Sequence, residues 1–208
     1  MQAIESAILW PDGKVYFFRG TTYVPYDVVD DRADPGVPLP IAGKWPGLQG
    51  LSRLDGAVAW PNGKAYFFSG DRYFRFDIAA NHTDPGSPFP TFPNWRGIQE
   101  GPNRSREVNA VLLWPNGKAY LFQNDRYYSF DVAADKVDIG YPKLIGDGWP
   151  GLAASGQQFV AAFVWPQLVE GRQKAYFFHP SIYYRYDVVN DSVDPGYPLN
   201  IDGNWPGL

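Results

Sequence analysis

Apolar and polar positions along the chain follow a unit of about fifty residues that is written four times. Each unit begins with a short apolar run that ends in Trp-Pro. A polar turn, a run of aromatic residues, a second turn and an alternating run follow, and the unit closes on Trp-x-Gly-Leu or Trp-x-Gly-Ile. A repeat of this length marks one supersecondary unit that buries its apolar faces only against its neighbours.

All eight tryptophans of the chain occupy these two repeated positions. The opening tryptophans are Trp10, Trp60, Trp114 and Trp165, and the closing ones are Trp45, Trp95, Trp149 and Trp205. Their regular placement beside Pro and Gly favours a role as wedges between units over a role in carbohydrate binding. The repeated tyrosines Tyr16, Tyr66, Tyr120 and Tyr176 are likewise interpreted as packing residues rather than as a stacking surface for bases or sugars.

Within the second copy the pattern predicts short strands joined by tight turns. Strands are expected at 57–60, 64–68 and 73–77, and Asn62-Gly63 supplies a turn that tolerates positive φ. A fourth, Pro-rich segment near Pro88-Phe89 suits the outer edge of a sheet, because proline cannot donate to a ladder. A helical turn is expected before Trp95.

Short antiparallel strands in four equivalent units predict an all-β fold, a four-bladed β-propeller with short helical turns at the blade ends. The blades are expected at 3–48, 53–98, 107–152 and 158–208, within one domain covering 1–208. An open solenoid is the structural alternative, but solenoids end in polar caps, and here the first and last copies are as aromatic as the middle ones.

Two segments break the repeat. A longer linker at 99–108 joins the second and third copies, and an insertion at 167–173 enlarges the first hairpin of the fourth. Insertions on a repeat scaffold are expected in loops and often mark the binding side. The linker residues Arg104 and Arg106 are candidates for contacting an anionic partner, and an ordinary solvated linker is the alternative.

Composition narrows the function classes. The formal net charge is −4 and the isoelectric point is about 5.1, which argues against sequence-independent binding of nucleic acid. The chain has no cysteine, so disulfides and cysteine-based metal or redox sites are excluded. No apolar run is long enough to span a membrane, and no signal-peptide pattern is visible.

Candidate catalytic groups are scarce. The chain has two histidines, and it lacks the His-Glu-x-x-His, Gly-x-Ser-x-Gly, phosphate-loop and dinucleotide patterns. The recurrent acids Asp27, Asp77, Asp131 and Asp187 end the third strands, where bonding to turn amides is expected. We therefore predict a protein that is not an enzyme, with a hydrolase built from carboxylates as the remaining alternative.

Two stretches resemble a known repeat. Asp138 to Leu152, with its Gly-Tyr-Pro and Gly-Trp-Pro-Gly-Leu steps, is similar to the end of a hemopexin-like repeat, and Gly63 to Asp77 is similar to its middle. The resemblance covers all four units. This family includes the C-terminal domains of matrix metalloproteinases, vitronectin, hemopexin, plant seed albumins and bacterial photopexins. The resemblance implies a four-bladed propeller with a narrow central tunnel and a non-catalytic binding role.

The resemblance also implies an ion in the tunnel, calcium or sodium, with chloride as a further ion. In the family, backbone carbonyls of the first strand hold the cation, usually at an Asp-Ala pair. Counting four residues back from each opening tryptophan places a first layer at Ser6, Gly56, Ala110 and Ala161, and a second layer at Ile8, Val58, Leu112 and Phe163. No first-layer residue is Asp, although Glu5, Asp55 and Asn109 stand one position earlier. The family disulfide between the last and first blades is absent, so closure has to rest on packing.

Haem is a further ligand that the resemblance implies, and histidine is a common axial ligand. The candidates are His82, in a polar loop, and His179, at the turn position that Arg19, Ser69 and Gln123 hold in the other copies. Two solvated loop histidines without a ligand are the simpler interpretation.

The sequence thus predicts a non-enzymatic binding protein that uses a rigid propeller to bind a small ligand such as haem, a polyamine or a metal ion. A protein- or glycan-interaction module with only a structural tunnel ion is the alternative. A monomer or a homodimer is expected. Members of the family are mainly extracellular, and the sequence leaves the compartment of this chain open.

Overall fold

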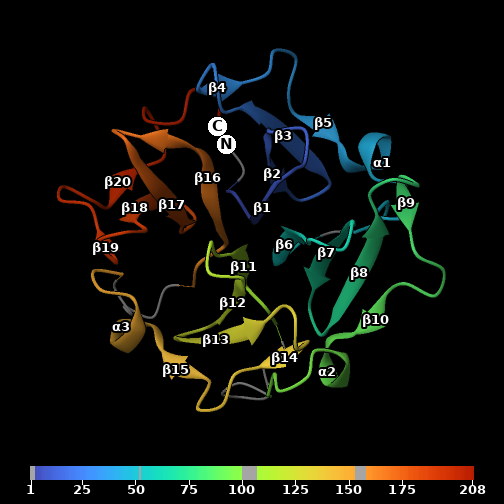
Figure 1. Cartoon of the computed structure of the whole chain (residues 1–208). Helices are drawn as coiled ribbons and strands as arrows, with labels where there is room; N and C mark the ends of the chain where they lie inside the picture. Colours follow the sequence, from blue (N-terminus) through green and yellow to red (C-terminus); the bar gives the residue numbers. More distant parts are fainter. Residues whose placement is uncertain (1–2, 52, 100–106, 153–157) are drawn as a thin grey trace.

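The computed structural model describes residues 3–51, 53–99, 107–152 and 158–208, and in this part of the chain four β-sheets stand around a common axis (Figure 1). Each sheet has five strands and is made from one repeat. The innermost strands of neighbouring sheets contact one another around the axis. The predicted four-bladed β-propeller is therefore confirmed, and each sheet is called a blade below.

The blades share the same order of five strands, and in blades 1 to 3 a one-turn helix follows the last strand. Blade 1 contains β1 (Ser6–Leu9), β2 (Val15–Arg19), β3 (Thr22–Asp27), β4 (Arg32–Ala33), β5 (Leu39–Pro40) and α1 (Ile41–Lys44). Blade 2 contains β6 (Gly56–Ala59), β7 (Lys64–Ser69), β8 (Arg72–Asp77), β9 (His82–Thr83), β10 (Phe89–Pro90) and α2 (Thr91–Asn94). Blade 3 contains β11 (Ala110–Leu113), β12 (Lys118–Gln123), β13 (Arg126–Asp131), β14 (Lys136–Val137), β15 (Lys143–Leu144) and α3 (Ile145–Gly148). Blade 4 contains β16 (Ala161–Val169), β17 (Arg172–Phe178), β18 (Ile182–Asp187), β19 (Ser192–Val193) and β20 (Leu199–Asn200).

The outer edge of each blade differs from the expectation of one extended segment. The third strand pairs with two separate two-residue strands, as β8 does with β9 and β10. His82, expected in a loop, therefore lies in β9 opposite Asp77. The reversal that creates this extra strand is stabilised by Asp77, whose Oδ1 accepts the Ala80 N–H at 2.8 Å. The expected helical turn before Trp95 is present as α2.

The acidic residues at the ends of the third strands have the structural role that their recurrence predicted. In blade 2, the second oxygen of Asp77 lies 2.8 Å from Lys64 Nζ, which also lies 2.9 Å from Asp84. The same arrangement of one lysine between two aspartates recurs in blades 1, 3 and 4. It ties the first hairpin of each blade to the outer edge of the same blade.

The insertion in blade 4 forms strand rather than loop. β16 continues to Val169 and β17 begins at Arg172, so the extra residues lengthen the hairpin into a ribbon with a register shift between Val164 and Leu168. The pairs Leu168–Gln173 and Val169–Arg172 satisfy the backbone of the ribbon. The expectation that this insertion is a loop was wrong.

Packing between blades forms the core, and it also closes the ring. Between blades 4 and 1, Phe17, Tyr26, Phe178 and Trp205 belong to one buried apolar cluster. The Ala33 N–H donates to Pro206 O at 2.9 Å, which repeats the bonds Thr83–Pro46, Val137–Arg96 and Val193–Pro150 at the other three junctions. Closure thus uses the same contacts as every other junction, without a disulfide.

Candidate functional site

Every blade carries the same group of four aromatic rings, which we call the aromatic cage. It consists of the opening tryptophan, a tyrosine of the second strand, a tyrosine of the third strand and the closing tryptophan. In blade 1, Tyr16 and Phe18 lie on the same face of β2, because alternate residues of a strand share a face. Tyr23 of β3 pairs with Phe18, so the two tyrosines lie on the same side of the blade. The helical turn then carries the closing tryptophan onto them. The four cages are Trp10, Tyr16, Tyr23 and Trp45; Trp60, Tyr66, Tyr73 and Trp95; Trp114, Tyr120, Tyr127 and Trp149; and Trp165, Tyr176, Tyr183 and Trp205.

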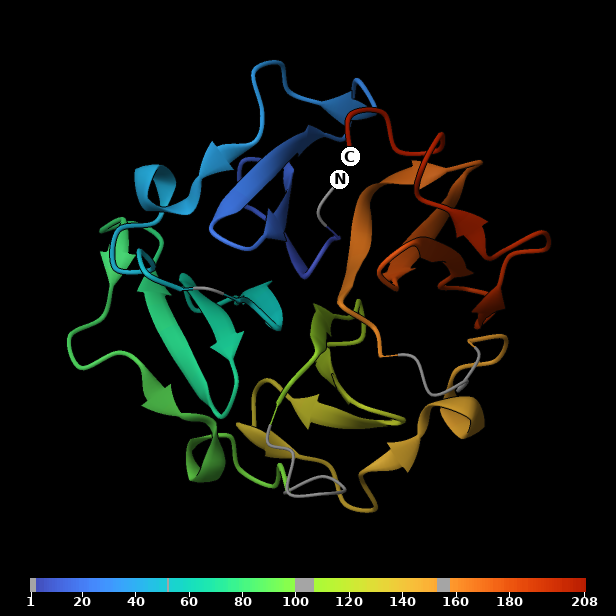
Figure 2. The same cartoon turned by 180° about the vertical axis from the view of Figure 1, so that it is seen from behind.

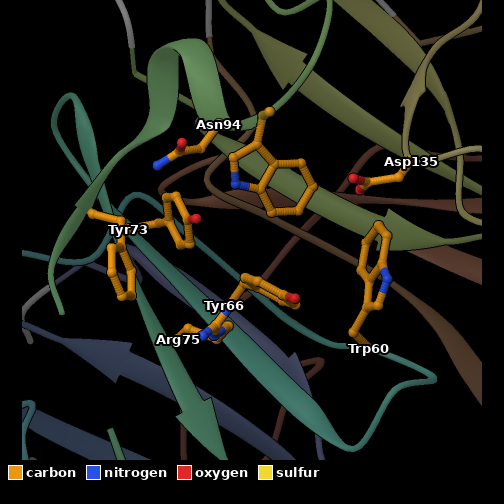
Figure 3. Close-up of a pocket in the computed structure, with 8 residues that line it drawn as sticks. Trp60, Tyr66, Tyr73, Arg75, Asn94 and Asp135 are labelled. Atoms are coloured by element: carbon orange, nitrogen blue, oxygen red, sulfur yellow. The ribbon is translucent and has the colours of Figure 1, made fainter. Parts of the chain in front are cut away.

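In blade 2 the cage opens into a groove of about 360 Å³ (Figure 3). The rings of Trp60 and Trp95 are almost perpendicular, at 88°, with centroids 5.5 Å apart. Tyr66 lies 5.2 Å from Trp95 at 81°, so the rings present both faces and edges to the groove. Burial raises the pKa of Tyr73, which keeps this phenol neutral. The site is thus a neutral aromatic surface with an opening to solvent.

Three polar side chains complete the blade-2 groove. Figure 3 shows Asn94 beside Tyr73 at one end and Asp135 near Trp60 at the other. Arg75 also lines the groove, but it forms an ion pair with Asp84, and its guanidinium carbon lies 5.4 Å from the centre of the Phe89 ring. The cation of Arg75 is therefore already compensated.

Asp135 reaches the groove from the neighbouring blade, in the turn between β13 and β14. In blades 1 and 4 the equivalent residues Asp31 and Asp191 accept a hydrogen bond from a tyrosine, as Tyr26 donates to Asp31 at 2.9 Å. Blade 3 has Phe130 in place of that tyrosine. Among the described residues, no hydrogen bond or ion pair engages the Asp135 carboxylate, which leaves a negative charge at the groove.

In blade 1 the equivalent cage is filled by a side chain of the protein itself. Lys44 Nζ lies 4.5 Å from the centre of the Tyr16 ring, 5.7 Å from that of Trp45 and 6.0 Å from that of Trp10. It also lies 3.8 Å from a carboxylate oxygen of Asp12. These are the distances of cation–π contacts. The cage therefore accommodates an alkylammonium group.

The residue before the closing tryptophan decides the state of each cage. It is Lys44 in blade 1, Asn94 in blade 2, Gly148 in blade 3 and Asn204 in blade 4. At Gly148 an added Cβ would lie 1.8 Å from the Tyr127 hydroxyl, so that tyrosine takes up the space. Blade 4 resembles blade 2: a groove of about 380 Å³ is lined by its cage, Asn204, Arg185 and, from blade 1, Asp31.

The sequence predicted that the repeated tryptophans and tyrosines pack between blades, and this describes the closing tryptophans better than the other cage residues. The closing tryptophans are buried, as wedges between units should be. The opening residue Trp60 and the strand residue Tyr66 are only half-buried and line a groove. In the sequence, the cages differ at the position before the closing tryptophan, which is Lys44, Asn94, Gly148 or Asn204.

The residues predicted to line the tunnel all lie on the inner strands β1, β6, β11 and β16. They are buried there: Ser6, Gly56, Ala110 and Ala161 in the first layer, and Ile8, Val58, Leu112 and Phe163 in the second. A narrow, apolar cavity of about 90 Å³ is lined by the ends of these strands.

The hydrogen-bond pattern between the first and second strands of a blade determines which carbonyls of the first strand face the axis. The Trp10 N–H donates to Lys14 O across the first hairpin. In an antiparallel pair every second residue exchanges both bonds with its partner, so Ile8 and Ser6 direct their carbonyls toward β2. Residues one position later face the axis instead. The register therefore moves the proposed ion ligands to Ala7, Ala57, Val111 and Ala162.

Acidic side chains near the tunnel are engaged elsewhere. Glu5 accepts the Gly20 N–H at 3.1 Å, and Asp55 accepts the Gly70 N–H at 2.6 Å. Asn109 accepts the Asn124 N–H in the same way. A tunnel ion would therefore be held by neutral carbonyl oxygens, a donor set that fits a hard cation such as sodium or calcium.

The two histidines lie in different blades and different environments. His82 is exposed, with Nδ1 2.8 Å from Thr83 O. His179 is buried, which corrects the expectation of a solvated loop residue: its Nδ1–H donates to Gln158 O at 2.8 Å and its ring stacks on Phe159. Burial lowers the pKa of His179, against the hydrogen bond to Gln158. The geometry does not bring the two haem-ligand candidates together.

Arg104 and Arg106 lie outside the described residues. Within residues 3–51, 53–99, 107–152 and 158–208 no group of three or more His, Asp or Glu side chains is arranged to hold a metal ion. None of the helices described is both long enough and apolar enough to cross a membrane.

Comparisons with known proteins agree with this architecture. Neutrophil collagenase of Homo sapiens is 36% identical over 90 residues, which cover 43% of this chain and 17% of that protein. The chain thus spans less than a fifth of the length of the metalloproteinases it matches first. The hemopexin fold protein CP4 from cow pea superposes with a TM-score of 0.76 at 20% identity, over 99% of this chain and 96% of that one. A plant lectin with two metal binding sites from Cicer arietinum gives a TM-score of 0.74 at 20% identity, over 96% and 91%.

The family model for hemopexin matches four segments, residues 4–50, 54–100, 108–153 and 159–208, so that every repeat is covered. The chain belongs to the hemopexin family.

Proposed function

We propose that the protein is a non-catalytic binding module whose open blade-2 groove takes ligands with an alkylammonium group, of the polyamine class. One observation carries the proposal: in blade 1 the same cage holds the ammonium group of Lys44. In blade 2 the side chain at that position is the shorter, uncharged Asn94, and the groove is open.

The charges around the blade-2 groove support a cationic ligand. Asp135 supplies a negative charge at the Trp60 end, as Asp12 does for Lys44 in blade 1. Arg75 is compensated by Asp84 and does not repel a second cation at full strength. Each ring face contributes about 0.5–2 kcal/mol to holding an ammonium group, depending on its desolvation. An affinity on the order of 1 mM or tighter follows for a short diamine.

The test introduces a lysine into the open grooves of blades 2 and 4, at the position that Lys44 occupies in blade 1. Cadaverine, whose aminopentyl chain resembles a lysine side chain, is titrated into the protein and followed by calorimetry and tryptophan fluorescence. Asn94→Lys places a tethered ammonium group in the blade-2 groove and is expected to weaken cadaverine binding there at least tenfold. Asn204→Lys is the matched variant for blade 4.

Each outcome of this titration bears on the proposal. Saturable binding in the unmodified protein that is lost in the double variant Asn94→Lys, Asn204→Lys supports it. Binding that persists unchanged in the double variant, or equal binding of the uncharged analogue 1-pentanol, contradicts it. Circular dichroism of each variant checks that the propeller is intact.

Glycan recognition is a second candidate. It is favoured by the combination of aromatic faces with the side chains of Asn94 and Asp135 in one groove, and by the fold shared with a protein described as a plant lectin. A glycan array probed with the protein and with Asn94→Lys separates the two candidates. Retention of neutral oligosaccharides that the substitution abolishes would favour glycans over amines.

A further inference from the structure

The four blades place different side chains at one equivalent position, where the second strand ends. These are Arg19, Ser69, Gln123 and His179. The inner and second strands have the same register in all four blades, because the residue before this position pairs with the first residue of the inner strand, as Phe18 does with Ser6. A different side chain at an otherwise repeated position marks a local function.

Three of the four side chains form at least one hydrogen bond within the protein, although His179 Nε2 is also buried without a partner. Ser69 donates to Arg53 O at 3.0 Å, and His179 donates to Gln158 O at 2.8 Å. Gln123 accepts a hydrogen bond from the Tyr128 hydroxyl at 3.2 Å. This position is therefore normally closed by a bond to a neighbouring segment.

Arg19 is the exception. Only 9% of its surface is exposed, and its Nε is buried without a hydrogen-bond partner. Within the described part of the chain no carboxylate forms an ion pair with it. Glu5, whose N–H donates to Phe18 O beside Arg19 in the same hairpin, accepts the Gly20 N–H. Burial lowers the pKa of Arg19, and no neighbouring charge offsets that burial.

An unpaired buried guanidinium is costly, because its lost hydration is not replaced. Proteins normally pair such a group with a carboxylate or phosphate, and the planar guanidinium favours two parallel hydrogen bonds to a carboxylate. Among the described residues, the buried Nε of Arg19 has no hydrogen-bond acceptor.

Arg19 also lines a pocket of about 350 Å³ at the junction of blades 4 and 1. The first described residues and the C-terminal residue Leu208 both line this pocket, between β1 and β16 in Figure 2. The pocket walls are mainly apolar, and Ser181 and Asp202 add polar groups. Its apolar residues include Ile4, Ile201 and Leu208.

We propose that this pocket binds a monocarboxylate with an apolar tail, whose carboxylate pairs with the Arg19 guanidinium. Ile4, Ile201 and Leu208 contact the tail, and Ser181 adds a hydroxyl to the pocket wall. The exposed carboxylate of Asp202 repels a second negative charge, which disfavours phosphate and other dianions. The site shares no residue with the blade-2 or blade-4 grooves, and it does not depend on the amine proposal.

The test is a titration of the full chain with sodium octanoate, followed by calorimetry and by the melting temperature. Arg19→Gln gives blade 1 the residue that blade 3 carries and is expected to weaken octanoate binding at least tenfold. Arg19→Lys keeps the charge and loses the paired hydrogen bonds, so an intermediate loss is expected. Arg53→Gln is the matched control, because it removes an exposed arginine that is already paired with Asp55.

A second readout separates the site from a purely structural role of Arg19. Octanoate is expected to raise the melting temperature of the unmodified protein and of Arg53→Gln, and to leave that of Arg19→Gln unchanged. Octanoate that fails to bind the unmodified protein, or that binds Arg19→Gln equally well, would overturn the proposal. Equal binding of inorganic phosphate would overturn the choice of a monocarboxylate.

Discussion

Lys174 Nζ lies 2.7 Å from Asp194 Oδ1, and both side chains are buried, with 3% and 10% of their surface exposed. The same ammonium group lies 2.9 Å from Asp187 Oδ2. In blade 3 the equivalent Lys118 makes the same two contacts at 2.8 and 2.9 Å, but 27% of its side chain is exposed. The same arrangement of one lysine between two aspartates, called the charge triad below, is thus buried in blade 4 and partly exposed in blade 3.

This difference predicts unequal effects of the same substitution. Lys174→Met leaves two buried carboxylates whose remaining cationic partners, among the described residues, are Arg172 and Arg185, and we expect it to lower the free energy of unfolding by about 3 kcal/mol. Lys118→Met removes a solvent-screened contact and is expected to cost clearly less stability than Lys174→Met. Urea unfolding of both variants measures the difference. Equal losses would show that burial does not set the strength of the triad.

The triads also predict the response to acid. Although burial opposes it, hydrogen bonds from Asn190, Lys174 and Val189 hold the pKa of Asp187 well below its usual range. Lys64 and neighbouring amides lower that of Asp77 in the same way. The unfolded carboxylates, with pKa values near 3.9, therefore bind protons first. Stability should begin to fall below about pH 6.5, where the unfolded chain protonates His179 while burial keeps its folded form neutral, and should fall more steeply below about pH 4, where the carboxylates take up protons.

Melting temperatures between pH 2 and pH 7 measure this dependence. Asp187→Asn removes one of the contributing groups and should flatten the acid limb, at the cost of a lower melting temperature at pH 7. An acid limb of unchanged slope in that variant would assign the loss of stability to other groups.

Sequence alone predicted the parts of the fold that repeat. The Trp-Pro steps, Asn-Gly turns and aromatic runs recur at fixed spacing, so the strands β6, β7 and β8 and the helical turn α2 followed from local chemistry. The two-residue strand β9 could not be predicted in this way. Its pairing depends on a reversal held by Asp77, which brings a polar segment back to β8.

The candidate sites were harder to predict because they depend on contacts between blades. The blade-2 groove joins Trp60 to Asp135, which lies in the next repeat. The carbonyls that face the tunnel follow from the hydrogen-bond register, which a count back from Trp10 missed by one residue. The burial of His179 likewise depends on Phe159 and Gln158, which precede it by about two strands.

Each closing tryptophan is followed two residues later by a glycine, and replacing the one at the junction of blades 4 and 1 should cause a steric clash. Gly207 has φ +91°, and an added Cβ would lie 2.6 Å from the Ala33 Cβ of blade 1. We expect Gly207→Ala to lower the free energy of unfolding by about 3 kcal/mol, from backbone strain and the clash together. Gly13→Ala is the control, because Gly13 has a similar φ of +86° and open space around the new Cβ. It should cost only about 1 kcal/mol. Chemical denaturation of both variants gives the comparison.

The carbonyl ring at Ala7, Ala57, Val111 and Ala162 predicts a tunnel cation. Dialysed protein should contain about one sodium or calcium ion per chain. Because an ion that binds only the folded state stabilises it, calcium should raise the melting temperature of chelator-treated protein. Elemental analysis and calorimetric scans test both statements. A metal-free protein whose melting temperature does not respond to calcium would contradict the prediction.

Opening the blade-1 cage gives the most direct test of what the cages hold. Lys44→Asn removes the tethered ammonium group and leaves Trp10, Tyr16 and Trp45 around a free space, with Asp12 still bound to the Tyr16 hydroxyl. The variant should lose about 1 kcal/mol of stability, because the cation–π contacts and the Asp12 ion pair are gone. It should also gain about one cadaverine site per chain, and cadaverine should restore part of the lost stability. Lys136→Asn, at an exposed lysine of β14, should do neither. A Lys44→Asn protein that binds no additional amine would show that the cage holds Lys44 only because the residue is tethered there, and the open grooves of blades 2 and 4 would then need a ligand of different chemistry.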